Sequence, residues 1–156
     1  MSENDAVQIL IVEDTPEDLE LALRALRKAN LTNRIQVARD GAEAIEFIFA
    51  EGAHSGRKVE NGPKVILLDL KLPKVDGLEI LHKCKTDPRT RNIPVVVLTS
   101  SREEGDLMRS YHLGVNSYVV KPVDFPQFTD AVRQLGLYWM FLNQVPSEPL
   151  ATPDPH

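Results

Sequence analysis

Short runs rich in apolar and β-branched residues alternate along the chain with segments in which apolar residues recur at helical spacing. The runs are three to six residues long and lie at residues 7–12, 33–38, 65–68, 94–98 and 118–120. Such runs are typical of strands that are covered on both faces, as in a parallel sheet. Because a helical pattern follows each run and right-handed crossovers are the rule, the sequence predicts an α/β, doubly wound (βα)5 fold.

Start signals precede the helical segments. The candidate N-caps are Thr15, Asp40, Asp76 and Ser101, and each of the last three is followed by a glutamate three residues later, which is the capping-box spacing. The spacing also predicts inward apolar stripes in the first two helices. These stripes are Leu19, Ala22, Leu23 and Leu26 in the first helix, and Ile45, Ile48 and Phe49 in the second.

Length and composition favour one globular domain. The chain has 156 residues, of which 42% are hydrophobic and 26% charged. Residues 52–63 lack periodicity and are predicted to form a long surface loop. Residues 146–156 hold four prolines. We therefore assign residues 1–145 to the domain, including an extended last helix, and residues 146–156 to a loose proline-rich tail.

Charge and cysteine content narrow the function classes. The net charge of −5 argues against nucleic acid as a partner, since phosphate binding needs a basic surface. The one cysteine, Cys84, cannot form an internal disulfide. The N-terminus lacks the apolar segment of a signal peptide, and no apolar run is long enough to span a bilayer. A cytoplasmic protein without a membrane partner is expected.

Functional side chains directly follow four of the predicted strands. Glu13 and Asp14 follow the first, Asp69 the third, Thr99 the fourth and Lys121 the fifth. The carboxyl ends of parallel strands share one edge of the sheet, and ligands bind there beside the switch point in strand order. In a five-stranded flavodoxin-like sheet of order 2-1-3-4-5, the first and third strands are neighbours. The three acids are therefore expected to lie together.

Clustered carboxylates repel one another, and a hard divalent cation relieves the repulsion. Mg²⁺ prefers oxygen ligands and is bound through one or two carboxylates plus a phosphate; Mn²⁺ or Ca²⁺ are candidate substitutes. A carboxylate in such a site can attack a phosphoryl group and form an acyl phosphate. Lys121 would add positive charge, and Thr99 would add a hydrogen bond. The pattern predicts a Mg²⁺-dependent phosphoryl acceptor.

The chain resembles the receiver domain of two-component response regulators over residues 7–143. The motifs that carry this resemblance are Glu13-Asp14, the segment from Asp69 to Gly77 with its L-P and D-G pairs, Thr99, and Lys121-Pro122. The resemblance implies a signalling protein, not an enzyme, that a histidine kinase phosphorylates on Asp69. It also implies that phosphorylation switches a protein-interaction surface of the domain.

The resemblance assigns roles to individual residues. It implies that Mg²⁺ is held by Glu13, Asp14, Asp69 and the backbone carbonyl of Lys71. It further implies that Thr99 and Lys121 contact the phosphoryl group, so that Asp69, Thr99 and Lys121 carry the transfer chemistry. Thr99 and Tyr118 match the residues that switch conformation on activation.

The loop at residues 52–63 and the last helix further resemble single-domain regulators partnered with bacterial phytochrome histidine kinases. Beyond Leu135 the last helix is apolar almost all round. An exposed surface of this kind is unusual in a monomer, so we expect a homodimer. The predicted dimer surface comprises Leu137, Tyr138, Met140 and Phe141. The alternative is that the tail folds back over these side chains.

Two other functions remain open from the residues. One is a receiver-like interaction module that works without phosphorylation. The other is a phosphatase with an aspartate nucleophile. That class requires a second acid two residues after the first, and Lys71 occupies this position.

Overall fold

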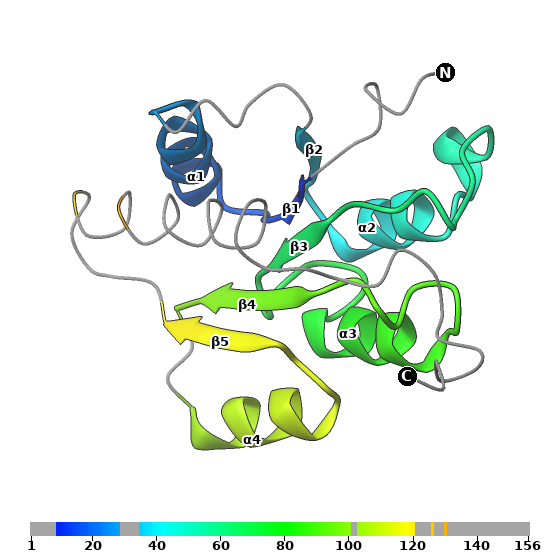
Figure 1. Cartoon of the computed structure of the whole chain (residues 1–156). Helices are drawn as coiled ribbons and strands as arrows, with labels where there is room; N and C mark the ends of the chain where they lie inside the picture. Colours follow the sequence, from blue (N-terminus) through cyan, green and yellow to red (C-terminus); the bar gives the residue numbers. More distant parts are fainter. Residues whose placement is uncertain (1–8, 29–34, 101–102, 121–125, 127–129, 131–156) are drawn as a thin grey trace, which may run out of the picture.

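Five parallel strands form the centre of the molecule, in the order β2-β1-β3-β4-β5 (Figure 1). The structure is a computed structural model, and it describes residues 9–28, 35–100, 103–120, 126 and 130. The strands are β1 (Ile9–Val12), β2 (Ile35–Ala38), β3 (Val65–Leu68), β4 (Val95–Thr99) and β5 (Ser117–Val120). The helices are α1 (Pro16–Lys28), α2 (Gly41–Ile48), α3 (Gly77–Thr86), α4 (Glu104–His112) and the short 3-10 helix η2 (Gly52–His54). The predicted doubly wound fold and its strand order are confirmed.

The described helices cover both faces of the sheet (Figure 1). Alternate strand residues point to opposite faces. Ile9, Ile11 and Leu67 pack with α1, whereas Leu10 and Val12 pack in the cluster that contains α2 and α3. All four residues of β1 and of β3 are buried, as expected for central strands. The strands β1 and β3 end at the same edge of the sheet, where the acids follow them.

The apolar stripes of the first two helices differ in detail from the prediction. Leu23 in α1 is half-buried, and Ala25 is fully buried instead. In α2, Phe47 is buried whereas Phe49 is half-buried. A small residue at position 25 lets α1 approach the sheet, while Phe47 packs beneath the loop that follows α2.

Helix starts agree with the sequence at three of four places. α1 begins at Pro16, directly after Thr15. Asp40 caps α2 by accepting a hydrogen bond from the backbone N–H of Glu43 at 2.8 Å, and Asp76 caps α3 by accepting one from the backbone N–H of Leu78 at 3.1 Å. The prediction for α4 is wrong, because the N-cap position is Glu103 and not Ser101. The backbone at Glu103 is extended, and its side chain makes no capping bond.

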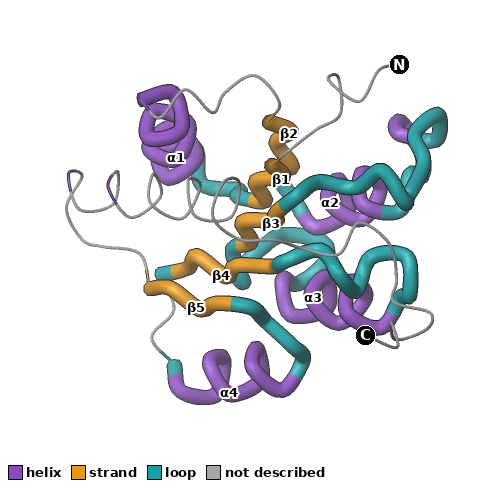
Figure 2. Tube along the Cα trace, in the orientation of Figure 1, coloured by secondary structure: helices purple, strands orange, loops and turns teal. Residues whose placement is uncertain are grey.

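Residues 52–63 form the predicted loop after α2 (Figure 2), and Arg57 ties this loop to the end of α2. The Arg57 guanidinium donates hydrogen bonds to the backbone carbonyls of Phe47 and Ile48 at the end of α2. It also lies over the Phe47 ring, 4.3 Å from the centroid, in a cation–π contact. These bonds satisfy carbonyls that have no partner within the helix.

Replacing Asp40 with alanine is expected to lower the free energy of unfolding by about 1 kcal/mol at pH 7, because an N-cap acceptor is lost. The backbone N–H of Glu43 and then Lys74, at 3.2 Å, lower the pKa of Asp40 below its usual value. A carboxyl group with a lowered folded-state pKa stabilises the fold above its unfolded pKa. That contribution is lost as the pH falls through the folded-state pKa.

Urea unfolding of wild type and Asp40→Ala along a series of decreasing pH values tests this expectation. The difference between the two proteins should shrink below about pH 4, the unfolded value for aspartate. Asp40→Asn keeps the cap oxygen without the charge, so its stability should depend less on pH than that of wild type. A constant difference between wild type and Asp40→Ala at every pH would contradict the expectation.

Cys84 is a free, fully buried thiol in α3, and burial raises its pKa to about 12. No helix in the described ranges has the length and apolarity to cross a membrane. Beyond Val120 the structure describes Pro126 and Asp130, both helical. The predicted dimer surface and the proline-rich tail lie outside the described residues.

Candidate functional site

Strand register brings two of the three acids to the same point of the sheet. Val12, at the end of β1, pairs with Leu68, at the end of β3. The next residues are Glu13 and Asp69. Their backbone N–H groups extend the hydrogen-bond ladder, because Glu13 donates to Ala38 at 3.0 Å and Asp69 donates to Val12 at 3.1 Å. Both side chains therefore start from a rigid backbone.

The predicted convergence of the three acids is confirmed. Glu13, Asp14 and Asp69 each offer one carboxylate oxygen, and these oxygens all lie within 4.8 Å of one another. Glu13 and Asp69 are 5% and 7% exposed, whereas Asp14 is exposed. The cluster is therefore closed on the side of the sheet and open to solvent at Asp14.

Two donors orient the Asp69 carboxylate. The Thr99 hydroxyl, fully buried at the end of β4, donates to Oδ1 at 2.8 Å. The backbone N–H of Lys71 approaches the same oxygen at 3.4 Å. These bonds to Oδ1 fix the orientation of the Asp69 carboxylate, which lies beside the carboxylates of Glu13 and Asp14. This is the kind of fixed geometry that group transfer requires.

The loop from Asp69 to α3 is held by close backbone contacts. Gly77 begins α3, and its N–H donates to the carbonyl of Leu70 at 3.0 Å. A Cβ at Gly77 would lie 2.4 Å from the Asp69 carbonyl oxygen. On the other side, the N–H of Gly41 donates to the Pro73 carbonyl at 3.1 Å. Two helix starts thus pin the loop that carries the candidate phosphoacceptor.

The donor set fits a hard divalent cation. Three carboxylates within one coordination sphere repel one another, and their charge is balanced best by an ion that prefers oxygen ligands. The exposure of Asp14 leaves an open side for water and for a phosphate oxygen. Glu13 is further oriented by the backbone N–H of Thr15, 3.3 Å from its Oε2. The arrangement can therefore hold a cation next to Asp69.

Other predicted site residues are placed only in part. Tyr118 is half-buried on β5 and packs against the cluster that contains α2 and α3. Lys71 is exposed, and its ammonium pairs with Asp106 of α4 at 3.4 Å. Lys121 falls just beyond the last described residue of β5. Its predicted role stays a prediction.

Two acids that the sequence reasoning missed lie near the site. Asp18 of α1 lines a small cavity together with Glu13 and Asp69. Asp106 is 1% exposed on α4 and pairs with Lys71. Asp106, Ser110 and Leu113 recur at helical spacing, but this pattern does not predict burial, because two of the three residues are polar.

Comparisons with known proteins agree with this geometry. The family profile of the response regulator receiver domain matches residues 9–133. The chain is 42% identical over 143 residues to the probable methanogenesis regulatory protein FilR2 of Methanothrix harundinacea, covering 91% of this chain and 89% of that protein. It is 36% identical over 141 residues to the response regulator Rcp1 of Synechocystis, covering 89% of this chain and 92% of Rcp1.

Solved structures are similar over nearly the whole chain. The Mn²⁺-bound form of Rcp1 has a TM-score of 0.82 and 35% identity, covering 90% of this chain and 99% of that one. The phosphorylated cyanobacterial phytochrome response regulator RcpA has a TM-score of 0.83 and 36% identity, with the same coverage. The bacteriophytochrome response regulator AtBRR is 55% identical with a TM-score of 0.69, covering 89% of this chain and 99% of that one.

Proposed function

The chain belongs to the response regulator receiver family, and from this premise we propose that it accepts a phosphoryl group on Asp69 from a histidine kinase. As a receiver-domain response regulator it is a signalling protein, not an enzyme that turns over a substrate. The observation that carries the proposal is the convergence of Glu13, Asp14 and Asp69, whose carboxylate oxygens lie within 4.8 Å of one another.

The transfer needs positioning more than covalent assistance from the protein. One oxygen of Asp69 attacks the phosphorus of a phosphohistidine; the P–O bond forms, the P–N bond breaks, and the imidazole leaves. Thr99 holds the carboxylate through its 2.8 Å hydrogen bond. After transfer, the Thr99 hydroxyl is free to donate to a phosphoryl oxygen, which links the modification to the end of β4. Lys121 is the proposed cation that pairs with the phosphoryl group.

Mg²⁺ is the proposed cofactor. Glu13, Asp14 and Asp69 would hold it with the backbone carbonyl of Lys71, and Mn²⁺ or Ca²⁺ could take its place. When bound, the ion neutralises charge on the transferred oxygens. The Mn²⁺-bound structure of the relative Rcp1 supports a divalent ion in this family.

A phytochrome-type histidine kinase is the proposed partner. Three similar solved structures support this, because RcpA is described as a phytochrome response regulator, and AtBRR and RtBRR as bacteriophytochrome response regulators. The 55% identity with AtBRR supports a partner of the same type. The proposed domain spans residues 1–145. A homodimer through Leu137, Tyr138, Met140 and Phe141 stays a prediction, as does the switching role of Tyr118.

Intact mass tests the phosphoacceptor. Wild type incubated with acetyl phosphate and Mg²⁺ is expected to gain one phosphoryl group, about 80 daltons. Asp69→Asn should show no gain, because the amide cannot act as the nucleophile. Asp76→Asn is the matched control, since this aspartate only caps α3; it should gain mass as wild type does.

The outcomes separate the alternatives. Equal adducts on wild type and Asp69→Asn would place the phosphoryl group elsewhere. If wild type gains no adduct, and cells that carry the Asp69→Asn variant still signal, the protein is a receiver-like interaction module that works without phosphorylation.

A further inference from the structure

Helix α4 has an inverted burial pattern. Asp106 and Ser110 are 1% and 0% exposed, so they face the body of the protein. Leu107, Met108 and Tyr111 are 36%, 64% and 56% exposed. Surface helices normally bury the apolar side and expose the polar side. Helix α4 is therefore attached in part through the polar contacts of Asp106, and it presents an apolar stripe, which we define as Leu107, Met108 and Tyr111.

Asp106 is the centre of the polar attachment. Its Oδ2 lies 3.4 Å from the Lys71 ammonium, and its Oδ1 accepts a hydrogen bond from the Arg109 guanidinium at 2.8 Å. Arg109 belongs to α4 itself, whereas Lys71 belongs to the loop after β3. A buried carboxylate depends on its cations, because removal of one leaves less compensation for its charge in a poorly solvated place. The ion pair with Lys71 therefore helps to fix the position of α4.

Lys71 is also joined to the phosphoacceptor. Its backbone N–H is 3.4 Å from Oδ1 of Asp69. Its side chain is 62% exposed, and its flexible four-carbon stem lets the ammonium move while the backbone stays in place. The negative charge of Asp106 is the main cause that raises the Lys71 pKa, as expected for an ion pair that is formed in this state. One residue thus touches Asp69 through its backbone and α4 through its side chain.

We propose that the Lys71–Asp106 ion pair positions α4 according to the state of Asp69, and this inference rests on the proposed function. A phosphoryl group replaces one negative charge on Asp69 by about two and carries them toward solvent. The Lys71 ammonium is then attracted toward the phosphoryl oxygens and away from Asp106. With weaker compensation, Asp106 moves toward solvent together with α4. The apolar stripe changes position as a result.

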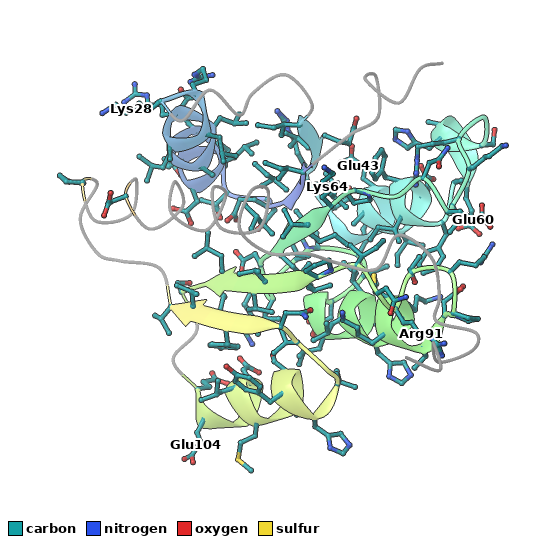
Figure 3. All side chains as sticks on the ribbon, in the orientation of Figure 1. Lys28, Glu43, Glu60, Lys64, Arg91 and Glu104 are labelled. Carbon is teal, nitrogen blue, oxygen red and sulfur yellow. The ribbon has the colours of Figure 1, made fainter. Side chains whose placement is uncertain are left out.

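This link differs from the hydroxyl switch at Thr99. Thr99 acts through the end of β4, whereas Lys71 and Asp106 act across space, from the loop after β3 to the first turn of α4. Figure 3 shows Glu104 at the outer side of the first turn of α4, away from the sheet.

Hydrogen exchange of α4 amides (residues 104–112), read by mass spectrometry, tests the proposal. Wild type should exchange about threefold faster in α4 after phosphorylation by acetyl phosphate with Mg²⁺, because Asp106 loses a cation that is itself mostly exposed while Arg109 remains bonded to it. Lys71→Met should show the faster exchange before phosphorylation and no further rise after it. Lys71→Arg keeps the cation and should restore the wild-type response.

Lys74→Met is the matched control. Lys74 lies in the same loop, is 65% exposed, and pairs with Asp40 at 3.2 Å, so it matches Lys71 in side-chain exposure and in pairing with an aspartate, but its partner does not belong to α4. Its exchange in α4 should equal that of wild type in both states. A general loosening of the loop would instead raise α4 exchange in both methionine variants, and this result would overturn the proposal.

Intact mass of the same samples keeps the two proposals distinguishable. If wild type and Lys71→Met are both phosphorylated and show the same rise in α4 exchange, the ion-pair link is overturned while the phosphoacceptor stands. If wild type gains no phosphoryl group, the proposed function fails. The comparison of unphosphorylated Lys71→Met with Lys74→Met then decides whether Lys71 holds α4, and equal exchange would overturn the link.

Discussion

Glu13→Gln is expected to weaken Mg²⁺ binding by about tenfold to a hundredfold and to raise the melting temperature of the cation-free protein. The glutamine removes one of three negative charges within 4.8 Å of one another, and affinity for such ions depends on the number of charged ligands. Without the ion, these charges repel one another by at least about 1 kcal/mol per pair at this separation, because two of the three carboxylates are poorly solvated. The same substitution therefore has opposite effects on binding and on stability.

Calorimetric titration with Mg²⁺ and thermal unfolding in a chelator measure the two effects. Glu17→Gln is the matched control, because Glu17 is exposed in the first turn of α1. It should bind Mg²⁺ as wild type does, and its melting temperature should fall slightly, since an acid at a helix N-terminus is favourable. If Glu13→Gln lowered the melting temperature of the cation-free protein, the acids would not be held together at the expense of stability.

Gly77→Ala is expected to lower the free energy of unfolding by about 3 kcal/mol, the upper range for overpacking. The new Cβ would lie 2.4 Å from the Asp69 carbonyl oxygen and 2.6 Å from the Leu70 Cα. Both are backbone atoms of the loop that carries the candidate phosphoacceptor, so they cannot move aside by a rotamer change. The phosphoryl adduct should also form more slowly, because relief of the clash displaces Asp69.

Gly105→Ala is the control for this substitution. Gly105 lies in the first turn of α4, and the nearest atom to a Cβ there is the Arg109 guanidinium at 3.9 Å. Alanine is expected to stabilise by about 0.5–1 kcal/mol at such a helical position. Urea unfolding compares both variants with wild type. Equal effects of the two alanines would show that close approach at Gly77 does not govern stability.

Local patterns predicted the parts of the structure that depend on neighbours in sequence. Strand β3 was predicted with its observed bounds, and the caps at Asp40 and Asp76 are present. The cluster of Glu13, Asp14 and Asp69 also followed from sequence, because parallel strands bring their carboxyl ends to one edge.

Predictions that depended on distant neighbours were less successful. Phe49 continues the helical spacing of Ile45 and Ile48, yet Phe47 is the buried phenylalanine. Arg57 and His54 pack against Phe47 from the following loop. The cap of α4 was placed at Ser101, where the capping spacing is present, but the helix begins later. A spacing rule states what a residue can do and not which of several positions the fold uses.

The sequence by itself determined the fold class, the edge at which chemistry occurs and the acids that gather there, because hydrophobic periodicity is a local property and general rules of strand connectivity restrict the topologies that it allows. Only the tertiary structure decided that Thr99 donates to Asp69 and that Lys71 pairs with Asp106. These contacts join residues far apart in the chain, and their existence depends on ångström-scale distances and on burial. Periodicity carries neither quantity, so the link from the acidic site to α4 became visible only in three dimensions.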